Sequence, residues 1–332
     1  MNKRTIISLL VSVFCFVVIF AVALMVGKYN MSISDFFKAV FTSEEAFDTQ
    51  RSIIVNLRLP RTIVAGLTGI ALSISGLLYQ EVFQNKLTSP DLLGVSSGAS
   101  VGAAIALVLG LSSIFVSLFA FITGVVTVLI TILVSKIFKN GSSFTLILAG
   151  IIVGGFMSAS LSLVKYFADP TTTLANITYW LMGSFENSTM NHVWILLPVV
   201  GVSCIVLLVL SWRINVVALG QEEAQTKGIN YNFYKFLIIG IATLLTATSV
   251  AFSGVVSWIG LVIPHIVRLI VGRDTRRSIP LCITFGGVFM IAVDILARTF
   301  TKSEMPLSAV TGILGTVIFV IIILIRRKEN AH

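Results

Sequence analysis

The chain has 332 residues, of which 56% are hydrophobic and only 11% are charged, and its mean hydropathy is +1.01. A soluble domain carries about 25% charged residues, because its surface must be hydrated. The composition therefore excludes a soluble enzyme of this length and indicates an integral membrane protein.

The formal net charge of +9 comes from 23 Lys and Arg residues against 14 Asp and Glu residues. The basic residues are spread over the polar segments between apolar runs, whereas a nucleic-acid-binding chain gathers them on one face or one helix. We therefore expect no nucleic-acid partner. An excess of Lys and Arg is typical of the loops that flank membrane spans.

Apolar runs without Asp, Glu, Lys or Arg recur along the whole chain, and one bilayer crossing needs roughly 20 such residues in a helix. The runs cover residues 5–27, 62–80, 92–135, 140–164, 187–212, 236–267, 278–293 and 305–325. Two are too long for one crossing: turn residues 109–113 divide one, and glycines between residues 253 and 260, with Pro264, divide the other. Since the runs lack the alternation of barrel strands, we predict an all-α bundle of about ten transmembrane helices in a single domain, residues 1–332.

The first run, residues 5–27, follows Lys3 and Arg4 as a signal peptide would. It is longer than the roughly 7 to 15 apolar residues of such a peptide, so we expect a retained first helix. The polar segment after it, residues 28–57, is predicted to be an outside loop with a short amphipathic helix around residues 34–40.

The Lys and Arg residues also predict the orientation in the membrane. With the N-terminus in the cytoplasm, fifteen of the 23 fall on the cytoplasmic side and eight on the other side. Cytoplasmic loops carry the excess of basic residues, so we expect both termini to be cytoplasmic.

Motifs for catalysis and cofactor binding are not found in the sequence. It has no G-x-x-x-x-G-K-[ST] phosphate loop, so any ATP is expected to be hydrolysed by separate subunits. The histidines and cysteines lack the spacing of a metal site or a disulfide framework: His192, His265, His332, Cys15, Cys204 and Cys282. We predict no catalytic residue, no metal and no cofactor.

Ionisable residues are scarce within the apolar runs, although a proton-coupled carrier needs them there. The clearest is Asp294, four residues before Arg298, so the two share one helix face. We expect them to form a structural ion pair at the outer boundary of the membrane.

Two runs carry a small residue at every fourth position and so present a smooth helix face. The first stripe is Gly94, Gly98 and Gly102, and the second is Gly150, Gly154, Ser158 and Ser162. Close helix packing is the favoured interpretation of the first stripe. For the second, packing and a translocation path are equally consistent, because small side chains leave room for a solute and serines offer it hydrogen bonds.

Two polar segments are candidates for contact with other proteins. The longest predicted cytoplasmic loop, residues 213–235, contains a segment that favours a short helix ended by Gly228. Such a helix is either a solvated connector or a docking surface for a soluble partner. On the outside, Arg58 and Arg61 flank Pro60, where they either anchor the helix at the interface or bind carboxylates of a docking protein.

Two groups of residues, which together extend over nearly the whole chain, carry a family resemblance. The first group is Arg58-Leu59-Pro60-Arg61, Gly69, Ser75-Gly76, Gln80, Asn85, Leu87, Pro90 and residues 93–99; the second is residues 259–268, Gly272-Arg273-Asp274, Asp294, Arg298, Glu304 and Pro306. In this order they resemble the signature of the permeases of iron-siderophore, haem and cobalamin ABC importers, the FecCD family.

The resemblance implies a type II importer permease of the bacterial cytoplasmic membrane. It also implies a homodimer, or a heterodimer with a paralogue, that binds two cytosolic ABC ATPase subunits and an extracytoplasmic substrate-binding lipoprotein. By the family pattern, the coupling helix that contacts the ATPase corresponds to Leu219, Gly220, Glu222, Glu223, Ala224 and Gly228. Arg58, Arg61 and Arg298 match arginines that engage the binding protein. The helix that carries the second small-residue stripe matches one that lines the central path.

The chain departs from the family pattern at four positions. Lys86 stands where the family has Pro, Trp258 where Phe is common, and Ser308 and Val317 where Gly and Pro are frequent. These departures affect local geometry, above all in the last helix.

Two classes of function are consistent with the sequence. The first is an ATP-driven importer permease for a ferric siderophore complex, with haem or cobalamin as alternative cargo. The second is a secondary transporter of a small solute driven by an ion gradient. The scarcity of carboxylates within the membrane spans favours the first.

Overall fold

The computed structural model describes residues 3–42, 44–138 and 143–329, and in this part of the chain all regular structure is helical. Eight helices are long and apolar enough to cross a membrane. They are α1 (Lys3–Met25), α6 (Ser113–Ile137), α7 (Ser143–Phe167), α9 (Met190–Val217), α11 (Tyr231–Ser253), α13 (Thr275–Thr299), α14 (Leu307–Glu329) and the segment that ends with α4 (Leu59–Val82). With the shorter apolar helices α5 (Val95–Val108) and α12 (Ile259–Val271), the prediction of about ten membrane helices is confirmed.

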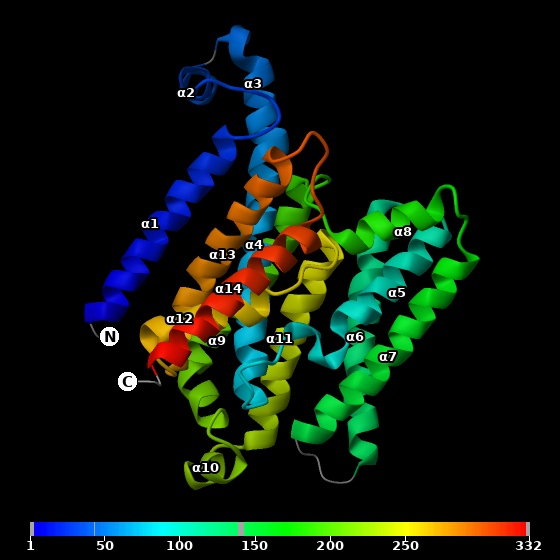
Figure 1. Ribbon diagram of the computed structural model, residues 1–332, viewed down its shortest axis with the longest axis vertical. Coiled ribbons are helices and arrows are strands. Elements are labelled where there is room, and N and C mark those ends of the chain that lie inside the picture. The colour runs from blue at the N-terminus through cyan, green and yellow to red at the C-terminus, as the bar shows by residue number, and fades with distance from the viewer. Residues whose placement is uncertain (1–2, 43, 139–142, 330–332) are drawn as a thin grey trace.

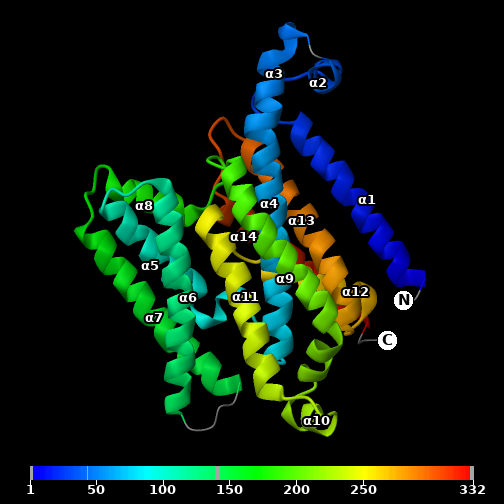
Figure 2. The same cartoon turned by 180° about the vertical axis from the view of Figure 1, so that it is seen from behind.

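Helix α4 lies at the centre of the bundle, and α9, α11, α12 and α13 pack around it (Figure 1). In the most apolar 18-residue window of the segment that ends with α4, 83% of the residues are buried. The buried share of the corresponding window is 11% in α1 and 17% in α7. Helix α1 packs on the outside of α13. Helices α5, α6 and α7 form a second group beside the first, and α11 joins the two groups (Figure 2).

Helix α4 crosses two neighbours at backbone contact, which requires glycine. A Cβ atom added to Gly76 would overlap the carbonyl oxygen of Gly260 at the start of α12. One added to Gly69 would overlap the carbonyl oxygen of Gly286 in α13. Small residues at such crossings let helix backbones approach closely, and this packing takes the place of the hydrophobic effect inside a bilayer. The two glycine pairs therefore fix the position of α4.

The segment predicted as an outside loop, residues 28–57, is only partly a loop. The amphipathic helix expected around residues 34–40 is present as α2 (Ile33–Phe41), with the Ser32 hydroxyl accepting a hydrogen bond from the Asp35 amide at 3.0 Å. Beyond it, however, α3 (Asp48–Ser52) and a π-helical stretch continue without a break into α4. The prediction of a loop there is wrong.

The π-helical stretch, Ile53–Arg58, has a physical cause in Pro60. A proline inside a helix has no N–H to donate, and its ring clashes with the carbonyl group four residues earlier. A wider π turn before it relieves that clash while keeping the helix continuous. The proline signal in the sequence therefore marks a change of helix type instead of a helix end.

The breaks predicted inside the two long apolar runs are confirmed with one correction. Helix α5 ends before α6 at the turn around Gly110, and α11 ends at Ser253 before Gly254, which has φ +68°. Pro264, however, lies inside α12 and does not divide the run. The irregular residues 254–258 alone separate α11 from α12.

The bundle has two distinct ends (Figure 1). Helices α2 and α3 lie at one end, here called the α2 end, and α8 (Thr173–Met182) lies towards it. The short helix α10 (Gln221–Thr226) projects at the opposite end, here called the α10 end, towards which both termini are directed. Because both termini lie on the side of α10, the structure agrees with an even number of membrane crossings. Which end of the bundle faces the cytoplasm stays a prediction.

The substitution Gly76→Ala should separate α4 from α12 and destabilise the protein by about 1 to 3 kcal/mol, because the new methyl group has no room. We expect a lower midpoint of thermal unfolding for the detergent-solubilised protein. The control is Gly240→Ala in α11, where an added Cβ meets no atom within 4 Å. Equal midpoints for Gly76→Ala and the parent would show that the crossing is not tight.

Candidate functional site

Charged side chains from three segments meet at the α2 end of the bundle. In the first turn of α4, Arg61 donates from Nε to Asp294 Oδ1 of α13 at 2.9 Å. Its two other nitrogens donate to the two carboxylate oxygens of Glu304, at 2.7 and 3.0 Å, in the loop before α14. Arg298 lies 3.5 Å from Asp294 on the same helix. We call Arg61, Asp294, Arg298 and Glu304 the Arg61 network.

Three of the four members of the Arg61 network are buried, and the formal charges of the network cancel. Asp294 is 0% exposed, Arg298 4% and Arg61 9%. Charges withdrawn from water are tolerated when they are paired and hydrogen-bonded, and a two-bond contact between Arg and a carboxylate is the strongest such pair. The predicted ion pair between Asp294 and Arg298 is confirmed, and it is part of a larger cluster that holds α4, α13 and the loop before α14 together.

Two arginines cap the end of α1. The last carbonyl groups of a helix have no partner within the helix, and positive side chains satisfy them. Arg58 donates three hydrogen bonds, and Arg298 donates one, to carbonyl groups at the end of α1 and just after it. The acceptors are the carbonyl oxygens of Ala23, Leu24, Met25 and Tyr29, at 2.6 to 2.9 Å. Helix α1 is thereby joined to α13 and to the helix that leads into α4.

The three arginines predicted to contact a binding protein, Arg58, Arg61 and Arg298, thus lie close together at the α2 end. They do not project as free side chains, because each already has partners within the chain. The sequence did not reveal this, since Glu304 and the carbonyl groups of α1 are far away along the chain. The docking role itself stays a prediction.

A cavity of about 660 Å³ lies next to the Arg61 network at the α2 end. Glu304 and Lys28, whose charged groups are 3.8 Å apart, form part of its wall. Trp180 of α8 and His192 of α9 also line it, as does the exposed Glu186. Glu304 is therefore the member of the network that reaches this cavity.

Helix α8, which forms one wall of this cavity, was not predicted from the sequence. Its start is organised by Asp169, whose carboxylate accepts hydrogen bonds from the side chains and the backbone amides of Thr171 and Thr172, at 2.6 to 3.1 Å. These bonds lower the pKa of Asp169 to about 2, the bond from the Thr171 side chain having the largest effect. The carboxylate therefore stays ionised and keeps this turn formed at neutral pH.

The short helix predicted within residues 213–235 is present as α10. Ala224 is buried against the bundle, whereas Glu222 and Glu223 are exposed. The helix ends as expected at Gly228, which has φ +70°, and the Ile229 amide donates back to the Ala224 carbonyl at 2.9 Å. Helix α10 is thus anchored on one side and free on the other.

Leu219 and Gly220 form the start of this projection. Leu219 is 55% exposed, and Gly220 has φ +115°, a conformation that favours glycine. A Cβ atom on Gly220 would lie 3.0 Å from Nε2 of the Gln84 side chain, just after the end of α4. The start of α10 therefore lies near the Gln84 side chain that follows α4.

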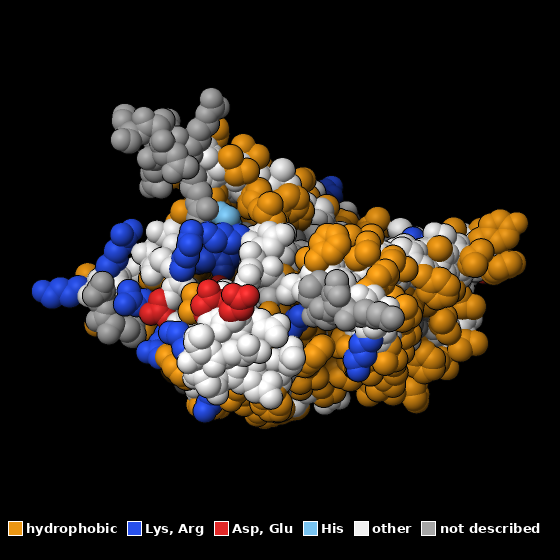
Figure 3. All heavy atoms as spheres, turned by 90° about the horizontal axis from the view of Figure 1, so that it is seen from below, with side chains coloured by type: hydrophobic (Ala, Val, Ile, Leu, Met, Phe, Trp, Pro, Cys, Tyr) orange, Lys and Arg blue, Asp and Glu red, His pale blue; other side chains and the backbone are white. Residues whose placement is uncertain are grey.

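Basic side chains are frequent at the α10 end, and a smaller acidic patch lies beside them (Figure 3). The exposed basic residues of the connections at this end are Arg213, Lys227, Arg273 and Arg276. An excess of Lys and Arg is typical of the cytoplasmic side of a membrane protein.

The two small-residue stripes differ in their surroundings. A Cβ atom on Gly98 or Gly102 would overlap threonine side chains of α6, so the packing interpretation of the first stripe is confirmed. In the second stripe, Gly150 packs in the same way against the Leu92 carbonyl, and Gly154 lies near Gly94. Ser158 and Ser162 lie further along α7 and are exposed on this single chain. Their role in a path stays a prediction.

Trp258, one of the four departures from the family pattern, has φ +71°, which is uncommon for a residue with a side chain. A Cβ on Gly315 of α14 would lie 2.5 Å from the Trp258 Cβ atom, so glycine gives the tryptophan room. Its ring contacts Phe319 with centroids 6.2 Å apart. Nothing in the structure explains Ser308 or Val317.

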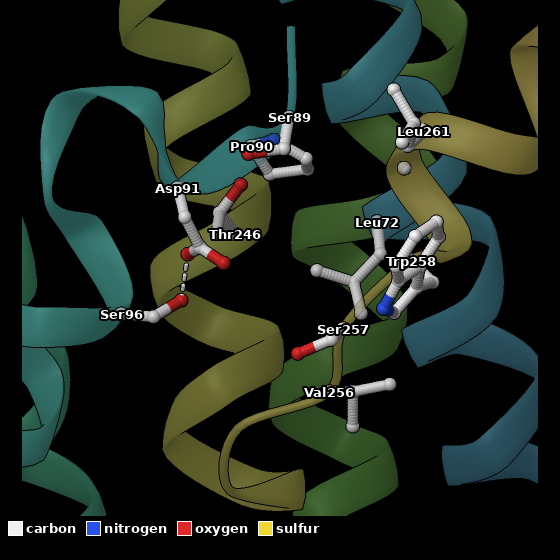
Figure 4. A pocket seen from close by; sticks show the side chains of 11 residues that line it. Leu72, Ser89, Pro90, Asp91, Ser96, Thr246, Val256, Ser257, Trp258 and Leu261 are labelled. Atoms are coloured by element: carbon white, nitrogen blue, oxygen red, sulfur yellow. Dashed lines mark hydrogen bonds between the residues drawn. The ribbon is translucent and has the colours of Figure 1, made fainter. Parts of the chain in front are cut away.

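Sequence reasoning missed Asp91, which directly precedes an apolar run and reads as a loop residue. The structure places it, partly exposed, in the 3-10 turn η3 (Pro90–Leu93), which packs against α5 and α7. It lines a cavity of about 220 Å³, the Asp91 cavity, whose wall includes Thr246, Ser257 and Trp258 (Figure 4). The combination of Pro90, Asp91 and Gly94 at the start of an apolar run was the signal for an irregular segment between α4 and α5.

Comparison with known proteins agrees with these features. The model of the FecCD transport family matches residues 15–326. The chain is 32% identical to the molybdate import system permease protein MolB of Haemophilus influenzae, with 91% of this chain and 90% of that protein covered. It is 30% identical to the hemin transport system permease protein HmuU of Yersinia pestis, with 95% and 96% covered.

A solved structure has the same fold. It is described as an inward-facing conformation of a putative metal-chelate type ABC transporter, and it superimposes with a TM-score of 0.86 at 30% identity, covering 95% of this chain and 98% of that one. Together with the helical bundle and the match over nearly the whole length, this shows that the chain belongs to the FecCD transport family and is an integral membrane permease subunit of an ABC importer, which works with separate ATPase subunits and a substrate-binding protein.

Proposed function

We propose that this permease imports a ferric siderophore complex, driven by ATP hydrolysis in two cytosolic subunits that contact α10. Two copies of the chain, or one copy and a paralogue, form the membrane part, and the α10 end faces the cytoplasm. The observation that carries the proposal is the projecting helix α10, anchored through Ala224 and exposing Glu222 and Glu223. The basic residues around it support the orientation.

Helix α10 is suited to transmit force from a soluble subunit. Its sharp start at Gly220 and sharp end at Gly228 bound a six-residue helix that packs on the bundle through Ala224 and exposes its other side. Helix α10 packs against the ends of α9 and α11, so movement of α10 would be passed to these two helices. Leu219 and the two glutamates offer an apolar contact and two charges to the groove of a partner.

The double substitution Glu222→Lys and Glu223→Lys should abolish the coupling while the bundle stays intact, because both side chains are exposed. We expect the ATP turnover that binding protein stimulates in proteoliposomes to fall about tenfold or more, since like charges would replace complementary ones. Gln221→Lys, which adds charge to the same helix and keeps both glutamates, is the control. Unchanged turnover in the double variant would exclude α10 as the coupling element.

The Arg61 network is proposed as the docking site for acidic side chains of the binding protein at the α2 end. Arg61 carries two hydrogen bonds to Glu304, and Glu304 borders the adjacent cavity. An external carboxylate would bind Arg61 in the geometry that Glu304 now uses. Charge reversal of the arginines is a poor test of docking, because it would also leave Asp294 buried without a partner.

The substitution Glu304→Gln tests docking in the direction of tighter binding. It leaves the positive charge of Arg61 less compensated, so we expect the affinity for the binding protein at low salt to rise about threefold to tenfold. A destabilised protein would not show such a gain. Glu186→Gln removes the same charge from the same cavity without touching an arginine of the network and is the control. Equal gains in both variants would mean that only the overall charge matters.

Helix α7 is proposed to line the translocation path between two copies of the chain. Much of its surface is exposed on the single chain, and the exposed strip includes Ser158 and Ser162. Small side chains at these positions leave room for a bulky solute, and the hydroxyl groups offer it weak hydrogen bonds. Gly150 and Gly154, nearer the α10 end, hold α7 against η3 and α5.

The cargo is tested by reconstitution with the ATPase and candidate binding proteins, each loaded with a ferric siderophore, haem, cobalamin or molybdate. We expect a ferric siderophore-loaded protein to stimulate ATP turnover and accumulation of its cargo in vesicles. Stimulation by another loaded protein alone would replace the siderophore as cargo. Accumulation under a sodium or proton gradient without ATP would favour the alternative, an ion-driven secondary transporter.

A further inference from the structure

Helix α2 exposes large apolar side chains along one strip of its surface. Ile33, Phe37, Val40 and Phe41, here called the α2 strip, are between 47% and 78% exposed. Their spacing of three or four residues places them next to one another on the helix, and the rings of Phe37 and Phe41 stack with centroids 6.2 Å apart. A contiguous apolar patch on a protein surface marks contact with a membrane or with another protein.

The rest of the chain fixes the orientation of α2. The helix packs on α3, and Ala39 on this side is buried. Arg51 of α3 caps the end of α2, donating to the carbonyl oxygen of Ala39 at 3.1 Å and to that of Thr42 at 2.6 Å. The α2 strip therefore faces one direction, away from α3.

Helix α2 lies across the long axis of the bundle, beyond the end of α1. It is seen nearly along its own axis in Figure 1 and again from behind in Figure 2, whereas α1 and α4 are seen from the side. A helix perpendicular to the membrane spans is parallel to the plane of the membrane. Interfacial amphipathic helices lie in this plane, with their apolar side buried at the boundary of headgroups and acyl chains.

The height of α2 fits the headgroup layer of a bilayer. On the continuous helix that leads into α4, Arg51 binds the end of α2 and Arg58 binds the end of α1. The two arginines are seven positions apart, which corresponds to a rise of roughly 10 Å. Headgroups extend about 5 to 8 Å beyond each side of the hydrocarbon core. Because α1 ends at the edge of its apolar run, α2 lies at the level of the headgroups, within reach of the acyl chains.

Lys38 shows which side of α2 is turned away from the membrane. Its ammonium group lies 5.6 Å from the centre of the Phe47 ring, in η1 (Glu45–Phe47). This turn begins the continuous helix that runs to Val82, so it is the part of that helix farthest from the bundle. Ile33 and Val40 lie roughly 140° and 160° around the helix from Lys38. The α2 strip is therefore turned towards the membrane.

The α2 strip also continues the lipid-facing surface of α1. In the most apolar window of α1 only 11% of the residues are buried. Its exposed apolar side chains extend through Val22 and Val26 to Tyr29, and Ile33 then begins the strip. The loop before α14 and helix α8, which border the cavity at the α2 end, lie on the other side of α3 (Figure 1). This position favours lipid over a docking protein as the partner of the strip.

We propose that α2 is an interfacial helix whose apolar strip inserts into the headgroup layer of the phospholipid bilayer beside α1. The strip is covered by lipid, whereas Ser34 and Lys38 stay in water. Because Arg51 joins α2 to α3, this contact holds the end of the continuous helix at a fixed height above the membrane. The role of α2 depends on neither the cargo nor the energy source of transport, so the permease alone is sufficient to test it.

The test is fluorescence quenching in nanodiscs of phosphatidylethanolamine and phosphatidylglycerol, where both membrane faces are open to solvent. The protein carries Cys15→Ala, Cys204→Ala and Cys282→Ala, and one new cysteine in α2 bears an NBD fluorophore. We expect a phospholipid with a nitroxide on its headgroup to quench the label of Ile33→Cys about threefold more strongly than that of Ser34→Cys. Both positions are exposed, and Ser34 lies on the polar side, so it is the matched control. Iodide in the water should quench the two labels in the reverse order.

Val40→Cys probes the α2 strip at the other end of the helix, and it replaces Ile33→Cys if that variant does not fold. A nitroxide near the end of an acyl chain should quench both labels less than the headgroup nitroxide, because an interfacial helix does not enter the hydrocarbon core. The proposal is overturned if lipid quenches the strip labels no more than the Ser34→Cys label, or if the chain-end nitroxide is the stronger quencher. Protection from iodide that appears only after binding protein is added also overturns it and assigns the strip to that protein.

Discussion

Backbone contact along α4 is the constraint on which the rest of the bundle depends. In a bilayer, apolar side chains gain little by leaving lipid for protein, so helices associate through close packing and hydrogen bonds. Helix α4 packs closely on its neighbours where Gly76 meets Gly260 and Gly69 meets Gly286. It is also hydrogen-bonded to α11, because the Ser75 hydroxyl donates to the Ala242 carbonyl oxygen. The peripheral helices α1 and α7 are less buried; α1 packs on α13, and α7 packs on α5 and α6.

The positions of the charged residues also follow from the membrane environment, because an ionised group inside the bundle needs a partner. At the α2 end, buried arginines pair with Asp294 and Glu304 or cap the carbonyl groups of α1, so no ionised group of the Arg61 network lacks a partner. At the α10 end, Glu222, Glu223 and Lys227 are exposed to water, whereas Lys235 is buried. Arg268 and Glu81, 3.1 Å apart, form a buried pair. Asp91, which is partly exposed, differs from these carboxylates because its partner is the Ser96 hydroxyl.

Much of the fold could be predicted from the sequence because span length and turn residues are local signals. The number of helices, the breaks near Gly110 and Gly254, and the short helix ended by Gly228 all follow from runs of a few residues. The continuous helix before α4 could not, because its polar outer turns resemble a loop and Pro60 resembles a helix start. Here the tertiary structure overrides local propensity.

The candidate sites were harder to predict, because their chemistry depends on residues that are distant along the chain. The arginines at positions 58, 61 and 298 were identified by family pattern, and their closeness to one another follows from the fold. Their engagement by Glu304 and by the end of α1 requires the folded structure. Asp91 was overlooked because its depth in the bundle is set by η3, a turn whose place no local pattern reveals.

The uninterrupted helix from Glu45 to Val82 has a mechanical consequence. Its 38 residues extend roughly 57 Å, more than the thickness of a membrane with its headgroups. Arg61 lies near its middle, and Gln84, whose side chain is near Gly220, lies just beyond its end at Val82. A stiff helix of this length tilts as a unit. A displacement of its end on one side of the membrane therefore displaces its other end by leverage, without a relay of side chains between them.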